Sequence, residues 1–249
     1  MTSLFRKYRP HDFSYFVGHD KVKRAIQVMA KRGSLGGKAF WISGPSGLGK
    51  TSLSYLMAGQ VCDPDNFIEI DAGGMTPKDI NDLEKQLRMR CLGEKSGRAV
   101  LINEAHGLRS DSIRQLLVVL ERIPAHATWI FTSTDTGRDK LFKDIDAHPL
   151  LSRCIKFELK VEDYADAMVL RAMAIAEQEG LGGATKSEWL KLCVDCKWNF
   201  RDVLTEVEKG VMVRDDVAEP VVPVVKGGVI EAPVVAEFDW SSLVDEMVA

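Results

Sequence analysis

The chain has 249 residues, of which 45% are hydrophobic and 28% are charged, and its formal net charge is −3. This composition is typical of a globular protein and excludes a disordered or collagen-like chain. No stretch approaches the roughly 18 consecutive apolar residues of a membrane-spanning helix, and the basic, aromatic N-terminus has no signal-like apolar run. We therefore expect a cytoplasmic protein that does not contact a membrane.

Five scattered cysteines indicate a reducing compartment rather than a disulfide framework. Cys193 and Cys196 form a C-x-x-C pair inside a helical pattern. A second ligand pair at zinc spacing is missing from the sequence around them, so we interpret both as small buried hydrophobic residues.

Apolar runs that alternate with helical patterns predict an α/β fold. The helical patterns between the runs carry apolar residues at a spacing of 3.6, which indicates a parallel sheet covered by helices on both faces. We place this core at residues 1–158. The five predicted strands are residues 38–43, 66–71, 98–103, 128–133 and 154–159.

Helical patterns continue alone after the last predicted strand. They indicate a small all-helical lid domain of about three helices at residues 159–213, with glycines at 180, 182 and 183 between the first two. Residues 214–249 are rich in Val, Pro and Glu and predict an extended acidic tail. Its end, FDWSSLVDEMVA, has the apolar spacing of a short helix that docks a partner or a neighbouring subunit, although a disordered terminus is an equal alternative.

The segment Gly44–Thr51 (GPSGLGKT) matches G-x-x-x-x-G-K-[ST] between a predicted strand and a predicted helix, the context that this phosphate-binding motif requires. Backbone N–H groups of such a loop surround the phosphates, and the helix N-terminus adds a positive dipole end. We expect Lys50 to reach the β- and γ-phosphates and Thr51 to ligate magnesium, which predicts ATP and Mg²⁺ as cofactors. The predicted nucleotide-binding residues here are Gly44, Pro45, Ser46, Gly47, Leu48, Gly49, Lys50, Thr51 and Ser52.

Residues 99–108 (AVLINEAHGL) predict a buried strand that runs into a polar turn. Nucleotide hydrolases often place a magnesium-ligating Asp and a catalytic Glu at such a turn, where this chain has Asn103 and Glu104. The amide lacks the charge of a carboxylate, so Asn103 is expected to hold magnesium less firmly, while Glu104 orients or activates the attacking water. We expect ATP binding with slow hydrolysis. The alternative is a catalytically silent site in which Asn103 only caps the turn.

With this loop in place, the chain resembles the AAA+ ATPases, and within them the clamp-loader subunits of the polymerase III gamma/tau and replication factor C small-subunit type. The similarity covers about residues 4–210. Five segments carry it in the order of the family: LFRKYRPHDFSYFVGHDKV, FIEIDAGG, WIFTSTD, LLSRCIKFEL and NFRDVL.

The resemblance implies roles for the matching residues. Thr134 would lie beside the γ-phosphate, Arg201 would be the sensor-2 arginine, and Arg153 would be the arginine finger that reaches the nucleotide of a neighbouring subunit. Residue chemistry alone favours surface salt bridges for both arginines, and only the resemblance favours phosphate contact. The base pocket would be lined by Tyr8, Arg9, Pro10 and Val17.

Two further departures from the family separate this chain from the gamma/tau subunits. The zinc module between the phosphate loop and the second strand is missing, which favours a phage-type or replication-factor-type subunit. About 36 residues follow the lid, too few for the family's helical collar domain. We therefore expect the subunits to assemble without a collar or with a partner.

We therefore interpret the chain as an ATP-binding, slowly hydrolysing AAA+ subunit of a clamp-loader-like DNA replication assembly. The nucleotide sites would lie at interfaces with identical or related AAA+ subunits. The assembly would hold DNA, and a sliding clamp is a candidate partner. An AAA+ DNA-remodelling or transposition-type assembly factor, or a nucleotide-binding scaffold that does not hydrolyse, are the alternatives. The helix that follows FIEIDAGG is expected to contact DNA through Thr76, Lys78, Arg88 and Arg90, although a solvated helix face is also consistent with these residues.

Overall fold

The computed structural model describes residues 3–91, 93–134 and 147–213. The acidic tail predicted for residues 214–249 and its docking helix lie outside these residues. In the described part, no helix is both long enough and apolar enough to cross a lipid bilayer.

A five-stranded parallel sheet forms the centre of the fold, and it confirms the predicted α/β class. The order across the sheet is β2-β3-β4-β1-β5. The strands are β1 (Lys38–Ser43), β2 (Phe67–Asp71), β3 (Arg98–Asn103), β4 (Ala127–Ser133) and β5 (Cys154–Glu158).

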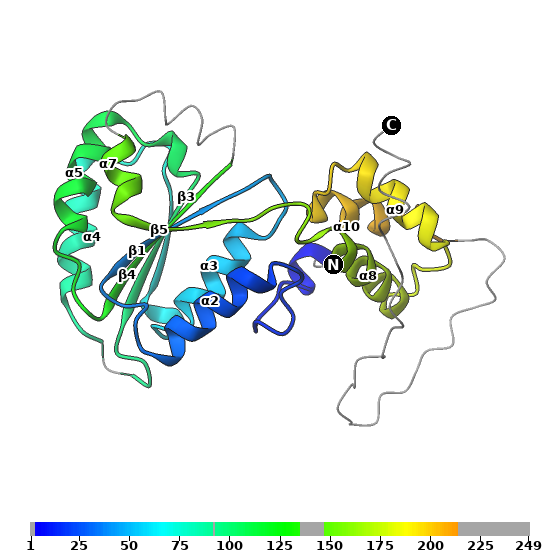
Figure 1. Ribbon diagram of the computed structural model, residues 1–249, viewed down its shortest axis with the longest axis horizontal. Coiled ribbons are helices and arrows are strands. Elements are labelled where there is room, and N and C mark those ends of the chain that lie inside the picture. The colour runs from blue at the N-terminus through cyan, green and yellow to red at the C-terminus, as the bar shows by residue number, and fades with distance from the viewer. Residues whose placement is uncertain (1–2, 92, 135–146, 214–249) are drawn as a thin grey trace. The chain divides into compact units, whose positions relative to one another are not determined.

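Helices cover both faces of this sheet, as Figure 1 shows, with α2 and α3 on one face and α4, α5 and α7 on the other. The helices before β5 are α1 (Leu4–Lys7), α2 (Asp20–Lys31), α3 (Lys50–Ala58), α4 (Pro77–Arg88), α5 (Ser110–Leu120) and α7 (Ala147–Ser152), with short 3₁₀ turns η1 (Pro64–Asn66) and η2 (Ala105–Gly107).

Successive side chains of the buried strands point to opposite faces of the sheet and so build two cores. Phe40 and Ile42 of β1 pack with Leu53 and Met57 of α3. Trp41, between them in the sequence, belongs to the core on the other face, which contains the apolar side chains of α4 and α5. Both faces are therefore apolar, which explains why the strands are continuous hydrophobic runs.

The helices predicted after the last strand are α8 (Ala165–Gln178), α9 (Lys186–Asp195) and α10 (Phe200–Glu208). Their apolar side chains, among them Met168, Trp189 and Val203, belong to the same core as α3. The division into a core that ends at residue 158 and a lid that begins at residue 159 stays a prediction.

Candidate nucleotide-binding site

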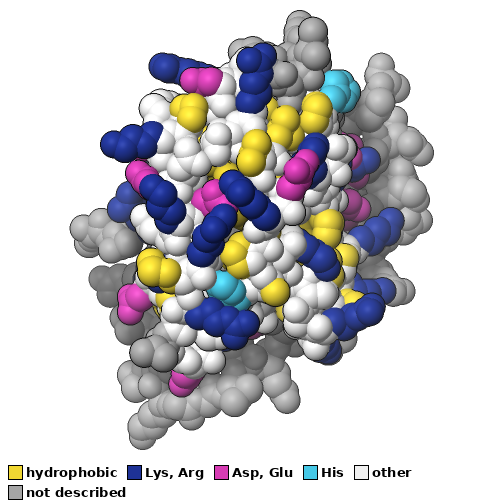
Figure 2. Space-filling view, turned by 90° about the vertical axis from the view of Figure 1, so that its left-hand side faces the viewer, with side chains coloured by type: hydrophobic (Ala, Val, Ile, Leu, Met, Phe, Trp, Pro, Cys, Tyr) yellow, Lys and Arg dark blue, Asp and Glu magenta, His cyan; other side chains and the backbone are white. Residues whose placement is uncertain are grey.

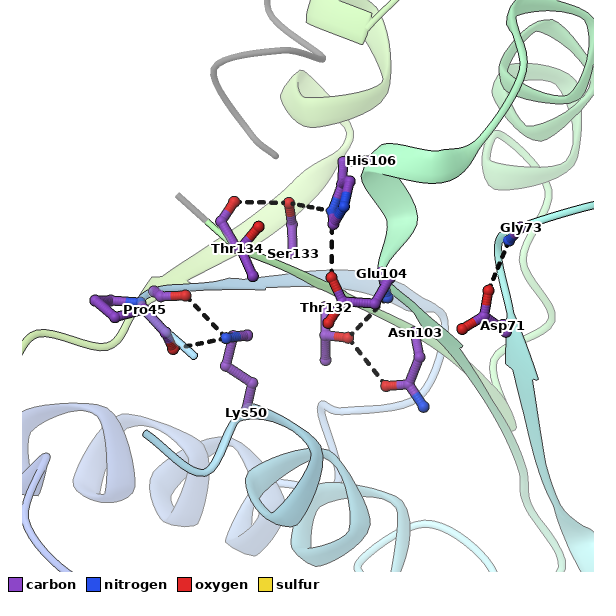
Figure 3. Close-up of polar contacts among 11 residues, drawn as sticks. Pro45, Lys50, Asp71, Gly73, Asn103, Glu104, His106, Thr132, Ser133 and Thr134 are labelled. Carbon is purple, nitrogen blue, oxygen red and sulfur yellow. Dashed lines mark hydrogen bonds and ion pairs between the residues drawn. The ribbon is translucent and has the colours of Figure 1, made fainter. Parts of the chain in front are cut away.

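The carboxyl ends of three neighbouring strands bring the predicted phosphate loop and the polar turn together. Because β3, β4 and β1 are parallel and adjacent, the residues that follow them lie along one edge of the sheet. Figure 3 shows Lys50 after β1, Asn103 at the end of β3 with Glu104 directly after it, and Thr134 after β4 at this edge. Ligands of open parallel α/β sheets bind outside such strand ends.

The phosphate loop, Gly44–Thr51, has a backbone that only glycine adopts easily. Gly47 and Gly49 have φ of 84° and 87°, and α3 begins directly after Gly49, at Lys50. The first N–H groups of α3 therefore face the loop, where a helix N-terminus favours an anion. Among the predicted loop residues, Gly47, Leu48, Gly49 and Ser52 also line an apolar cavity, described below.

The Lys50 side chain is buried and points back into the phosphate loop. Its Nζ donates hydrogen bonds to the carbonyl oxygens of Gly44, at 2.8 Å, and Pro45, at 2.7 Å (Figure 3). A buried ammonium group needs such acceptors, because leaving its donors unpaired away from water is costly. The lysine is thus held at the loop by groups that a phosphate can replace.

Hydrogen bonds through Thr132 of β4 hold the turn after β3. The Thr132 hydroxyl donates to Asn103 Oδ1 at 3.0 Å and accepts from the backbone N–H of Glu104 at 3.3 Å (Figure 3). Glu104 has the left-handed φ of 51°, which is strained for a residue other than glycine, and its side chain is exposed. The Glu104 carboxylate lies 3.4 Å from His106 Nδ1, whose ring also approaches the Ser133 hydroxyl.

An apolar cavity lies beside the phosphate loop. The N-terminal segment predicted to surround the base lines one side of it with Tyr8, Arg9, Pro10 and Val17. The structure therefore brings together four residues near the N-terminus and four residues of the phosphate loop region. Flat apolar walls with a few polar groups are typical of small-molecule sites.

Besides Phe5, Tyr15 and Phe16 of the N-terminal segment, the apolar cavity is lined by residues from later in the chain that sequence reasoning missed. Tyr164, Arg171, Phe200 and Leu204 line it, from α8, α10 and the turn before α8. They lie more than 140 residues after Tyr8 in the chain, and no local motif marks Tyr164 or Arg171. Phe200 and Leu204 fall within NFRDVL, but that segment assigns a role only to Arg201. Only the packing of the helices after β5 against the N-terminal segment could have identified them.

Tyr8 joins the N-terminal segment to α8. Its hydroxyl donates to the Glu179 carboxylate, which also forms an ion pair with Lys7 at 2.6 Å. Burial, together with the nearby carboxylate, raises the pKa of Tyr8 to about 12. The phenol therefore stays protonated at physiological pH and keeps donating this hydrogen bond.

The two predicted phosphate-binding arginines have other partners in the single chain. Arg153 forms an ion pair with Glu121 at 2.6 Å and donates to the Pro149 carbonyl oxygen. The Arg201 guanidinium lies 4.6 Å from the centre of the Phe5 ring, and Arg201 lines a second cavity, shared with Arg6 and Arg9, rather than the apolar one. Within the described ranges, neither guanidinium forms a hydrogen bond with the phosphate loop.

Oxygen donors suited to magnesium stand at the edge of the sheet. Thr51 offers a hydroxyl and Asn103 an amide oxygen, and Mg²⁺ takes oxygen ligands and usually needs few from the protein when phosphates are bound. Within the described residues no group of three or more His, Cys, Asp or Glu side chains is placed to hold a metal ion. The donors fit a magnesium ion that nucleotide phosphates also hold, but they do not form an all-protein metal cage.

The helix predicted after FIEIDAGG is α4. Thr76 caps the helix, Pro77 occupies its first turn, and Thr76 and Asp79 exchange hydrogen bonds in a capping box. These hydrogen bonds lower the pKa of Asp79. A carboxylate therefore stands at the helix N-terminus, where the sequence predicted contact with a DNA phosphate.

Basic side chains are spread over the face formed by α4, α5 and α7 (Figure 2). On and after α4 they include Lys78, Arg88 and Arg90, all of them exposed. Arg88 forms an ion pair with the buried Glu84 at 2.8 Å, whereas no ion pair of Lys78 or Arg90 is found among the described residues. The three basic residues among the predicted DNA contacts thus differ in how much of their charge is already balanced.

Comparison with known proteins agrees with the fold. The model of the AAA family, "ATPase family associated with various cellular activities", matches residues 40–160. In fold, the chain is similar to the RuvB Holliday junction branch migration motor of Thermotoga maritima, with a TM-score of 0.61 and 19% identity over 81% of this chain and 64% of that one.

Two curated proteins of DNA replication are similar in sequence to this chain. The replication factor C small subunit of Methanocella arvoryzae is 28% identical over 70% of this chain, and the DNA polymerase III subunit tau of Salmonella typhimurium is 32% identical over 64% of it. The chain spans 53% of the first relative and 27% of the second. It therefore carries a domain of the AAA family and is homologous to the clamp-loader AAA+ ATPases.

Proposed function

We propose that the chain is an ATP-binding AAA+ subunit of a clamp-loader-like DNA replication assembly, and that it hydrolyses ATP slowly at interfaces between subunits. One observation carries the nucleotide part of this proposal. The phosphate loop, whose carbonyl groups hold Lys50, adjoins an apolar cavity lined by aromatic side chains, an arrangement that favours one ligand with an apolar end and an anionic end. The names of the relatives support the replication part.

In this proposal the protein acts on ATP mainly by holding and orienting it. Lys50 exchanges the carbonyl oxygens of Gly44 and Pro45 for phosphate oxygens, and the first N–H groups of α3 bind the same phosphates. Thr51 and Asn103 would hold magnesium, which neutralises phosphate charge when bound. Glu104, exposed at the edge of the sheet, orients the attacking water and accepts its proton.

The neutral Asn103 supports slow hydrolysis. An amide oxygen adds no charge to the site, so the cation that stabilises the transition state is held less tightly than by a carboxylate. The same observation favours a second candidate function, a subunit that binds ATP and never hydrolyses it. The two candidates differ in phosphate release by the assembled protein with DNA, because the second predicts none above background.

Arg153 supports a site that is completed by a neighbour. In a single chain its guanidinium forms an ion pair with Glu121, the residue directly after α5. We infer that in an assembly it leaves Glu121 for the terminal phosphate of the adjoining subunit. Hydrolysis would then depend on assembly, as arginine fingers supplied in trans accelerate phosphoryl transfer strongly.

The test of nucleotide binding is ATP affinity of the full chain, measured by calorimetry, with Lys50→Ala as the variant. The loss of Lys50 removes the cation at the loop, so affinity should fall to the limit of detection. Lys21→Ala, which removes an exposed lysine from α2, is the matched control and should bind ATP like the unchanged chain. Equal affinity of the Lys50→Ala variant would refute the assignment.

A further inference from the structure

Glu69 is an acidic residue that the sequence motifs do not assign, and it contacts the turn after β3. Its carboxylate accepts hydrogen bonds from the amide nitrogen of Asn103 and from the hydroxyl of Tyr55 on α3. Glu69 pairs with Leu101 in the sheet, and Leu101 packs in the core on the α3 face. Because Asn103 lies two residues after Leu101, Glu69 and Asn103 project from neighbouring strands on the same face.

These contacts fix the orientation of the Asn103 amide. Its nitrogen end can only donate, and it donates to Glu69, whereas its oxygen end accepts from the Thr132 hydroxyl at 3.0 Å. Reversing the amide would set its oxygen against the Glu69 carboxylate, and neither group could then donate a hydrogen bond. The contact with Glu69 thus selects one orientation of the amide.

The same contacts explain why an amide occupies this position. An aspartate at 103 would place a second carboxylate against Glu69, and two like charges in contact repel. In this chain the negative charge stands one strand away, on β2, and the neutral residue stands on β3. Asn103 and Glu69 therefore form one hydrogen-bonded pair. The Asn103 amide occupies the position of the usual aspartate, and the Glu69 carboxylate accepts a hydrogen bond from it.

A link to the phosphate loop comes through Tyr55. Thr51 and Tyr55 are four residues apart on α3, so their side chains lie on the same side of that helix. The chain of contacts Asn103–Glu69–Tyr55 therefore ties the end of β3 to the helix face that carries the Thr51 hydroxyl. A shift of α3 relative to β3 would break it.

We propose that Glu69 is a positioning residue of the magnesium–nucleotide site, an inference that rests on the proposed function. Glu69 holds the Asn103 amide with its oxygen directed towards Thr132. Its carboxylate also supplies, next to the amide nitrogen, the negative charge that an aspartate at position 103 would carry. Groups that orient metal ligands in this way typically change metal affinity by about 10–100-fold when they are removed.

The experiment measures ATP affinity of the full chain by calorimetry with saturating Mg²⁺ and again with EDTA. The ratio of the two affinities is the magnesium-dependent gain. Glu69→Gln should lower this gain by about tenfold, because the amide of Asn103 loses its fixed orientation and its supporting charge. Its affinity in EDTA should equal that of the unchanged chain, which also shows that the variant is folded.

Two further variants separate this role from a structural one. Glu69→Gln combined with Asn103→Asp exchanges carboxylate and amide while it keeps the hydrogen bond between them, and it should restore the gain. Asp71→Asn removes the same charge from the same strand, where Asp71 accepts from the Gly73 N–H at 2.7 Å, and should leave the gain unchanged.

Three outcomes would overturn the inference: an undiminished gain in Glu69→Gln, an equal loss in Asp71→Asn, or no recovery in the double variant. In each of these the unchanged chain still binds ATP and the Lys50→Ala variant does not, so the proposed function stands. If the unchanged chain itself binds no ATP, the proposed function and this inference both fail.

Discussion

Asn199, the residue that caps α10, packs directly against Gly47 of the phosphate loop. A Cβ atom added at Gly47 would lie 2.0 Å from Asn199 Oδ1 and 2.6 Å from Asn199 Cα. The same Oδ1 accepts a hydrogen bond from the backbone N–H of Arg201 at 3.1 Å, so it is held in place by the helix start. The position of α10 and the shape of the phosphate loop are therefore coupled through one contact.

Gly47→Ala is expected to abolish ATP binding and to lower the thermal stability of the chain. The variant must tolerate a left-handed φ, which costs about 1 kcal/mol, and in addition force Asn199 away. Gly33→Ala is the matched control, because Gly33 has a similar φ of 62° and nothing within 4 Å of an added Cβ. Thermal unfolding and calorimetry of both variants separate the backbone strain from the clash. Equal effects of the two substitutions would mean that the Asn199 contact is unimportant.

Arg153→Ala should leave ATP binding by the single chain unchanged and suppress hydrolysis only in the assembled protein. The reason is that its guanidinium contacts Glu121 and not the phosphate loop of its own chain. A mixture of Arg153→Ala and Lys50→Ala chains should recover part of the activity, because some interfaces then combine an intact loop with an intact arginine. Phosphate release by the mixture is the measurement.

Glu121→Gln is the control for the Arg153 experiment. It removes the ion pair and keeps the arginine. A decrease in ATP hydrolysis caused only by the broken ion pair would therefore appear in both Glu121→Gln and Arg153→Ala. We expect Glu121→Gln to hydrolyse ATP at least as fast as the unchanged chain. A mixture that is no more active than its two parents would argue against a role in trans.

Local patterns were sufficient to predict much of this fold. The sequence TPKD places a capping residue and then a proline in the order that starts a helix, and α4 begins there. The five apolar runs were found because strands buried on both faces need continuous hydrophobic residues. Such signals depend only on residues that are neighbours in the chain, so they can be read from one sequence without knowing the tertiary contacts.

Contacts between distant parts of the chain could not be predicted in this way. The contact between Glu69 and Asn103 depends on which strands are neighbours and on their register, and neither is encoded locally. The wall that Tyr164 and Arg171 contribute to the apolar cavity depends on how α8 packs against the N-terminal segment. The position of Arg201 over Phe5 has the same origin, because α1 and α10 meet only in the folded chain.

His19 is expected to make the stability of the chain depend on pH. The residue is buried, stacks on Tyr164 with ring centres 5.3 Å apart, and has no hydrogen-bond partner for either ring nitrogen among the described residues. Burial lowers its pKa from 6.5 to about 4. Between these values the unfolded chain binds a proton that the folded chain does not, so stability is complete above pH 6.5 and decreases as the pH falls towards 4.

The measurement is the free energy of unfolding at several pH values from 7.5 down to 4.5. His19→Phe keeps a flat ring against Tyr164 and removes the titrating group, so the decrease between pH 6.5 and 4.5 should become smaller. His11→Phe changes an exposed histidine, whose ring lies tilted against Tyr15, and should leave the decrease in stability as it was. Identical curves for the unchanged chain and the His19→Phe variant would exclude His19 as the cause.

Lys78 and Arg90 should contribute more to DNA binding than Arg88. The charge of Arg88 is balanced by the buried Glu84, which also forms an ion pair with Arg122 at 3.0 Å. Moving Arg88 to a DNA phosphate would leave part of that buried charge uncompensated, which is unfavourable. Lys78 and Arg90 have no such partner among the described residues, so their charges are available to phosphates.

The comparison uses neutral variants and primed DNA in the presence of ATP, with affinity measured at several salt concentrations. The double variant Lys78→Gln, Arg90→Gln should bind DNA more weakly and reduce the salt slope by about one for each phosphate that is no longer neutralised. Arg88→Gln should change both quantities less, and Lys21→Gln, on a helix of the other face of the sheet, should change neither. If the double variant keeps full affinity and the full slope, α4 does not face DNA, because a basic surface that touches phosphates must release counterions when DNA binds.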